Sequence, residues 1–202
     1  MVQHLLDDLV ERGLDATQPM LTVLDGSKVL RQAVRKMLGD RSPVQRCPLH
    51  KRRNVKELLP PEFQRSADQR IKAAYGMKDF DQAKTQLEKM VEWLEGINPS
   101  AAASSLEGLE ETLTLHRMGL PEALRKSFPS TNLIESALSV ASDVAGRVKR
   151  WRAGDMRLRW IAVGLLAAEK QFRRVRGYKL MPKLLAALDV AASEIAEGFK
   201  AA

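Results

Sequence analysis

Hydrophobic positions recur with a helical period along most of the chain, and two short segments near its start depart from that period. The apolar run at 21–24 predicts a strand buried on both faces, and Gly26 and Ser27 supply a turn and a helix cap after it. The spacing that follows predicts a helix over 28–38, and residues 43–47 predict a second strand. Only these two strands are predicted, so the β structure is expected to be small. Two strands alone do not make a stable sheet.

The rest of the pattern predicts helices. A first short helix is marked by apolar positions between 5 and 10, and several amphipathic helices are expected between 50 and 128. The expected breaks between them are Pro60-Pro61, Gly76, Asn98-Pro99 and Gly119 to Pro121. One helical face is formed by Leu87, Met90, Val91 and Leu94. Further helices are predicted from Ser130 or Thr131, from 155 to 174 and from 181 to 199, which makes the fold class mostly α with a small β remnant.

Two acidic residues stand where chemistry is possible. Asp25 directly follows the first predicted strand, and ligands of α/β sheets gather at the carboxyl ends of strands. The alternative for Asp25 is a helix cap. Glu135 is predicted to lie on a helix, beside an apolar stripe formed by Ile134, Leu138 and Ala141. The alternative for Glu135 is a solvated surface position.

Cys47-Pro48-Leu49-His50, just past the second predicted strand, has half the spacing of a zinc site. The only other imidazoles are His4 and His116, and Cys47 is the single cysteine, so a structural zinc lacks ligands. A nucleophilic Cys-His pair lacks a third residue that would orient the histidine. The single cysteine excludes an internal disulfide framework and fits a reducing compartment. With no apolar run long enough for a membrane span and no signal peptide at the N-terminus, a cytoplasmic protein is expected.

The net charge of +8 is concentrated in one region. Eleven Lys and Arg residues lie between 147 and 179 against two acidic residues, and the remainder of the chain has a charge of −1. This is the electrostatic pattern of a phosphate-backbone binder, and the alternative is a solvated helical face. Trp151 is able to stack on bases, whereas Trp160 is expected in the core. The candidate DNA-binding residues are Arg147, Lys149, Arg150, Arg152, Arg157, Arg159, Arg173, Arg174 and Arg176.

Four runs, in this order, resemble the signature blocks of one family. They are Val23-Leu24-Asp25-Gly26-Ser27, Val44-Gln45-Arg46-Cys47-Pro48-Leu49-His50-Lys51-Arg52-Arg53-Asn54, Ser130-Thr131-Asn132-Leu133-Ile134-Glu135-Ser136 and Val148-Lys149-Arg150-Trp151. The family is that of the mutator-type transposases of bacterial insertion sequences, and the resemblance runs from about residue 7 to about residue 188. It implies a ribonuclease H-like core whose three acids bind two Mg²⁺ ions, with a helical insertion between the second and third acids. By that resemblance Asp25 is the second acid and Glu135 the third, both catalytic and metal-binding, and Cys47 with His50 is the Cys-x-x-His motif.

The same resemblance implies a domain plan. Residues 1–50 are expected to be the second half of a partial ribonuclease H-like α/β core. Residues 51–129 are expected to be the all-helical insertion, and residues 130–202 the C-terminal helices with the basic DNA-binding region. No acid on a strand precedes Asp25, because Asp7, Asp8, Glu11 and Asp15 follow a helical pattern. Ser142-Asp143 stands where the family commonly has an arginine pair.

The expected function is therefore DNA transposition by two-metal phosphodiester cleavage and strand transfer, in a truncated chain that is inactive alone. The expected partner is duplex DNA, both transposon ends and target, in the cytoplasm at the nucleoid. A homo-oligomer and a complex with full-length transposase are further possible assemblies. One alternative is a non-catalytic DNA-binding or assembly module that inhibits full-length transposase. The other is a helical RNA-binding protein without a carboxylate site.

Overall fold

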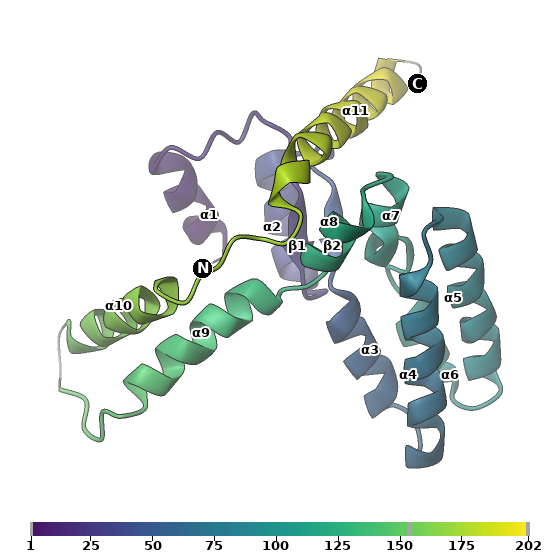
Figure 1. The fold of residues 1–202 in the computed structure, drawn as a ribbon, viewed down its shortest axis with the longest axis horizontal. Helices are drawn as coiled ribbons and strands as arrows, with labels where there is room; N and C mark the ends of the chain where they lie inside the picture. The colour runs from purple at the N-terminus through teal and green to yellow at the C-terminus, as the bar shows by residue number, and fades with distance from the viewer. Residues whose placement is uncertain (1, 153–154, 201–202) are drawn as a thin grey trace. The chain divides into compact units, whose positions relative to one another are not determined.

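A computed structural model describes residues 2–152 and 155–200 and shows a mostly helical chain with two short parallel strands. The chain divides into two compact units, Met1–Ser130 with Gly177–Ala202, and Thr131–Arg176. The first unit contains α1 Val2–Glu11, β1 Thr22–Leu24, α2 Lys28–Leu38, β2 Val44–Arg46, α3 Pro48–Glu57, α4 Pro61–Gly76, α5 Phe80–Glu95, α6 Pro99–Leu106, the 3-10 helix η1 Glu110–Leu113, α7 Thr114–Arg117, α8 Glu122–Ser127, the 3-10 helix η2 Tyr178–Leu180 and α11 Met181–Lys200. The second unit contains α9 Asn132–Ala145 and α10 Met156–Glu169 (Figure 1).

The two predicted strands are confirmed and pair in parallel, with Leu24 opposite Arg46. The expected burial of the first strand on both faces is wrong, because only Leu24 of β1 is fully buried and the sheet has no further described strand to cover it. The backbone N–H of Cys47 donates to the carbonyl of Leu24 at 2.7 Å and extends the pairing by one residue. Helix α2 connects the strands and has the predicted bounds of 28–38, because the Ser27 hydroxyl accepts from the N–H of Leu30 and fixes its start. Its buried face packs with α1 and β1 in a small apolar core that contains Leu6, Leu24, Ala33, Val34 and Leu38.

The helices from α3 to α6 form the largest core. Helix α5 buries the predicted face, and the other helices of this block contribute the surrounding apolar residues. The predicted breaks are confirmed, since α4 begins at Pro61 and ends at Gly76, and α6 begins at Pro99. Asn98 caps α6 through its side-chain oxygen, which accepts from the N–H of Ser100 at 2.9 Å. The buried face of α5 is Ala83, Leu87, Met90, Val91 and Leu94.

A third apolar cluster joins α7, α8 and the C-terminal helix. Leu115, Leu120 and Leu124 pack with Leu184 and Leu188 of α11, which brings the end of the chain back onto the first unit. Over the described residues, every helix is too short or too polar to cross a lipid bilayer.

The second unit is a helical hairpin in which α9 packs along α10. The two backbones approach closely at one point, where a Cβ on Gly164 would lie 2.6 Å from the Cα of Ala141. Because the contact is made by small residues, the larger apolar side chains of α9 lie outside the interface between the two helices. Of the predicted apolar stripe on α9, Ala141 is buried, whereas Ile134 and Leu138 are exposed.

Helix α10 ends at Glu169, five residues before the predicted end at Arg174. The run after Glu169 is cationic and polar, and Phe172, its one large apolar side chain, is 65% exposed. Helical extension would therefore bury nothing, and packing supplies most helical stability in proteins. Trp160, expected in the core, is only half-buried, because Gly164 and Ala168 occupy the buried side of the helix.

Candidate functional site

Asp25 lies at the carboxyl end of β1 and is exposed. One of its carboxylate oxygens accepts from the backbone N–H of Ser27 at 2.9 Å, which holds the turn into α2. The helix cap is Ser27 and not Asp25, so the capping alternative does not describe Asp25. Gly26 has a φ of 110°, a backbone conformation that glycine adopts without steric cost. The turn therefore presents an acidic side chain at the edge of the strand pair.

Glu135 lies in the first turn of α9 and is half-buried. The Thr131 hydroxyl donates to its carboxylate, and its backbone N–H donates to the carbonyl of Thr131 at 3.0 Å. The side chain is therefore held by the start of its own helix and is not a freely solvated surface group. Asp25 belongs to the first unit and Glu135 to the second, so the convergence of the two carboxylates stays a prediction.

Cys47 and His50 flank the start of α3, beside the ends of both strands. Cys47 is fully buried at the N-cap position of α3, and His50 is half-buried in its first turn. Across residues 2–152 and 155–200, no three His, Cys, Asp or Glu side chains are grouped as metal ligands. The Cys-x-x-His motif therefore adjoins the strand ends without forming a three-ligand centre within the described parts of the chain.

Sequence reasoning missed a buried polar cluster next to Asp25. The Arg46 side chain is 9% exposed, and its guanidinium donates to the Glu107 carbonyl at 2.8 Å and to the Glu107 carboxylate at 3.1 Å. Lys51, 3% exposed, donates to the carbonyls of Ser104 and Glu107. Burial and the charge of Arg46 lower the pKa of Lys51 to about 8. The hydrogen bond from Arg46 lowers the pKa of Glu107, which stays ionised between the two cations.

The backbone around Arg46 is shaped to admit its guanidinium. A Cβ on Gly26 would lie 2.7 Å from Arg46 Nε, and a Cβ on Gly108 would lie 2.6 Å from one Nη atom. Both glycines have positive φ. Arg46 therefore joins the Asp25 turn to the segment that ends α6. The available signal was an arginine within the second predicted strand, next to the Cys-x-x-His motif.

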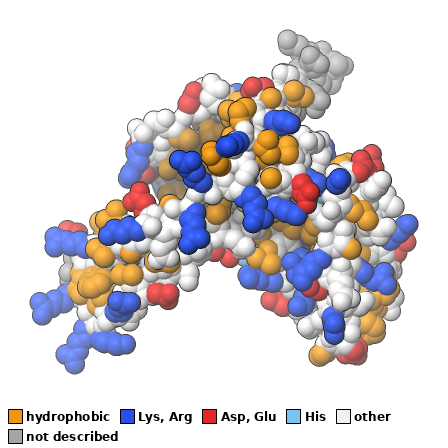
Figure 2. Space-filling view, in the orientation of Figure 1, with side chains coloured by type: hydrophobic (Ala, Val, Ile, Leu, Met, Phe, Trp, Pro, Cys, Tyr) orange, Lys and Arg blue, Asp and Glu red, His pale blue; other side chains and the backbone are white. Residues whose placement is uncertain are grey.

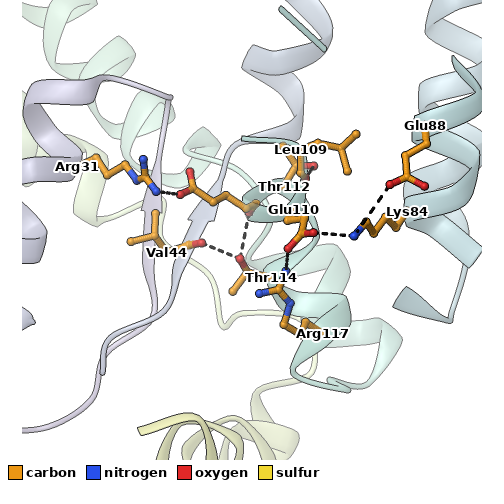
Figure 3. A network of polar contacts seen from close by, with 10 residues as sticks. Arg31, Val44, Lys84, Glu88, Leu109, Glu110, Thr112, Thr114 and Arg117 are labelled. Carbon is orange, nitrogen blue, oxygen red and sulfur yellow. Dashed lines mark hydrogen bonds and ion pairs between the residues drawn. The ribbon is translucent and has the colours of Figure 1, made fainter. Parts of the chain in front are cut away.

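A second group of polar contacts fixes η1 and α7 to β2. The buried Gln45 amide donates to the carbonyl of Thr112 at 2.7 Å and accepts from the N–H of Leu115 at 3.0 Å. The Thr114 hydroxyl donates to the carbonyl of Val44 at 2.7 Å, and Arg31 of α2 pairs with the Glu111 carboxylate. Figure 3 shows the contacts of Arg31 and Thr114, together with Glu110, which lies between Lys84 and Arg117.

The basic region lies almost wholly in the second unit. Thr131–Arg176 contains ten Lys and Arg residues against four acidic ones. All nine candidate DNA-binding residues are exposed, on the segment after α9, on α10 and on the segment that follows it. Ala153 and Gly154, within the basic stretch, lie outside the described residues. Figure 2 shows Lys and Arg side chains interleaved with hydrophobic ones over this hairpin, where Trp151 is also exposed.

The fold and these residues define a helical protein with an exposed acid at the end of a parallel strand pair and a separate basic hairpin. A family model described as "Transposase, Mutator family" matches residues 2–149. The chain belongs to the Mutator family of transposases, which confirms the resemblance and supports a role in transposition. No curated protein matches the chain.

Proposed function

We propose that this chain supplies the second and third catalytic carboxylates, Asp25 and Glu135, and a DNA-binding surface to a transposase that cleaves and joins phosphodiesters. The observation that carries the proposal is the position of Asp25, an exposed acid directly after a short parallel strand in a chain of this family. In open α/β sheets this edge is where ligands bind.

The parallel unit formed by β1, α2 and β2 is the part of a ribonuclease H-like core that the proposal assigns to this chain. Two parallel strands joined by a helix are the repeating element of such α/β cores. The helices from α3 to α8 would then be the insertion between the second and third acids. Gln45 and Arg46 bind this insertion to the strand pair through buried hydrogen bonds, which supports one continuous structure around Asp25.

The carboxylates of Asp25 and Glu135 are the hard oxygen ligands that Mg²⁺ prefers. When bound, a pair of such ions stabilises the attacking and leaving oxygens of an in-line phosphoryl transfer. The residues of this chain hold the ligands in place: the Ser27 N–H fixes one Asp25 oxygen, and the Thr131 hydroxyl fixes one Glu135 oxygen. These contacts orient each carboxylate relative to its own backbone segment.

Duplex DNA is the proposed partner of the basic hairpin. Its exposed cations would neutralise backbone phosphates, which positions the duplex with little sequence preference. Each neutralised phosphate releases about 0.9 of a condensed cation, so affinity for duplex DNA should fall steeply with salt.

The test is charge reversal within the hairpin. Arg150→Glu with Arg152→Glu should weaken binding of the 202-residue protein to all duplex sequences alike and reduce the salt slope by about 2. The matched control is Arg65→Glu with Lys89→Glu, the same charge change at exposed positions on α4 and α5. Fluorescence anisotropy of a labelled duplex at several salt concentrations measures both effects. An affinity that is independent of salt, or an equal loss in the control, would refute DNA binding through this hairpin.

One observation favours a second candidate, a non-catalytic DNA-binding or assembly module of a full-length transposase. Within the described residues no three acidic or imidazole side chains form a metal site. Addition of the 202-residue protein to full-length transposase acting on transposon-end DNA with Mg²⁺ or Mn²⁺ separates the two candidates. We expect no nicking by this chain alone, because two carboxylates are too few for a metal pair. Inhibition of full-length transposase by added chain would favour the module.

A further inference from the structure

A cavity of about 280 Å³ lies in the first unit, beside the Asp25 turn. It is formed by the first turns of α2, the strand pair and the segment from Glu107 to Glu111, and its residues all belong to the first unit. The residues that line it are Leu24, Gly26, Ser27, Lys28, Arg31, Gln32, Arg35, Val44, Arg46, Glu107, Gly108 and Glu111.

The lining is predominantly cationic. Four of these side chains are Lys or Arg and two are Glu, and both glutamates are already paired. Glu107 accepts from Arg46 and lies 3.7 Å from Lys28, and Glu111 pairs with Arg31. Arg35 pairs with Asp40, which does not line the cavity, at 3.4 Å. The four lining cations therefore face three carboxylates, and an incoming anion meets one net positive charge.

Backbone donors add to this field. Lys28 and Val29 are the first residues of α2, and N–H groups in a first helical turn have no intrahelical partner. The Ser27 hydroxyl accepts from the N–H of Leu30, in the same turn, and does not occupy these two groups. Helix N-termini of this kind bind phosphate and other anions.

Arg46 gives an independent indication of a missing acceptor. Its side chain is nine-tenths buried and lines the cavity, yet its Nε has no acceptor among the described residues. The same is true of Arg31 Nε. Buried polar hydrogens without partners are rare in native proteins, and an anion held against these side chains, with a small shift of the guanidinium groups, would supply acceptors.

We infer that this cavity binds the phosphodiester group of a DNA strand. Its volume is just below the range of about 300–1,000 Å³ usual for small-molecule sites, so it suits one phosphate with its sugar. None of its lining residues is aromatic, which leaves the base of a free nucleotide without a stacking platform. Recognition would therefore be of the backbone alone. The inference rests on the proposed function, since it places a DNA strand next to the turn that carries Asp25.

The experiment follows backbone amide chemical shifts of the 202-residue protein during titration with a thymidine dinucleoside monophosphate, which contains one phosphodiester. Inorganic phosphate is titrated in parallel. Shifts are expected at the amides of 26–32 with both probes. Lys28→Gln should weaken binding of the dinucleotide about fivefold, as loss of an exposed ionic contact would. Lys36→Gln is the matched control, an exposed lysine on α2 outside the cavity, and should change affinity less than twofold.

Each outcome is decisive. Shifts with inorganic phosphate but not with the dinucleotide would identify a free-phosphate site and overturn the inference. An equal loss in Lys36→Gln, or unchanged binding in Lys28→Gln, would also overturn it. Charge reversal of Arg150 and Arg152 should leave the dinucleotide shifts unchanged, so failure of DNA binding by the hairpin is distinguishable from failure at this cavity.

Discussion

Lys51 makes the stability of the first unit depend on pH in a predictable direction. Burial comes first among the causes that lower its pKa from 10.5 to about 8, and the charge of Arg46 adds to the effect. Between these two values the unfolded chain binds more protons than the folded one, so the free energy of unfolding should rise as pH increases. Below about pH 8 both states are protonated at Lys51, and the contribution of this group is flat.

The magnitude follows from the same pKa difference. One pKa unit corresponds to about 1.4 kcal/mol, so stability should increase by about 2 kcal/mol between pH 7.5 and pH 9.5 from this group. Lys51→Met removes the titrating group and keeps an unbranched side chain of comparable length. The variant should be less stable at every pH, because the carbonyls of Ser104 and Glu107 lose a donor. The free energy of unfolding of this variant should not show the increase of about 2 kcal/mol between pH 7.5 and pH 9.5.

Urea unfolding at several pH values measures the difference between the two proteins. Trp151→Phe and Trp160→Phe leave Trp93, which packs against the largest core, as the only tryptophan, so fluorescence then reports on the first unit. Other titrating groups are present in both proteins and cancel in the difference. If the difference in unfolding free energy between wild type and Lys51→Met is constant from pH 7.5 to pH 9.5, the conclusion that burial lowers the pKa of Lys51 is refuted.

Gly164→Val should destabilise the hairpin by about 1–3 kcal/mol, because its Cβ would lie 2.6 Å from the backbone of Ala141, whereas Gly76→Ala, with open space at its Cβ, should be neutral or stabilising. Amide hydrogen exchange in α9 and α10 measures the first effect, and unchanged protection would contradict the close approach. Asp25 and Glu135 should converge to within about 8 Å if they share a metal pair. A short bismaleimide should crosslink cysteines at 25 and 135 in a Cys47→Ala background, and equal crosslinking from position 143 would count against convergence.

The sequence predicted the local structure of the first unit well, because its signals are local. Helix α2 has the predicted bounds since apolar spacing and the Ser27 cap both lie within a few residues of its start. Asp25 was placed at a strand end for the same reason. The contacts of Gln45 and Arg46 were not predicted, because they reach backbone groups more than sixty residues away. Periodicity in one sequence identifies a face and not its partner.

The packing of α9 was not predicted, for a related reason. Spacing identified Ile134, Leu138 and Ala141 as one apolar stripe, but it did not identify which of the three would be packed. The hairpin packs through its smallest residues, since Gly164 allows α10 to approach Ala141 at backbone distance. Close packing of small residues excludes the long side chains on either side of the contact.

The small strand pair is supported by the helical segments that follow it. Among the described residues the parallel pair has no further strand beside it, and β2 is only three residues long. Polar contacts support the pair: Gln45 binds backbone groups of Thr112 and Leu115, and Arg46 binds Glu107. Because Arg46 also contacts the Gly26 turn, the segment from Glu107 to Leu115 helps to fix the backbone on which Asp25 stands. This segment is therefore part of the support for the candidate catalytic acid.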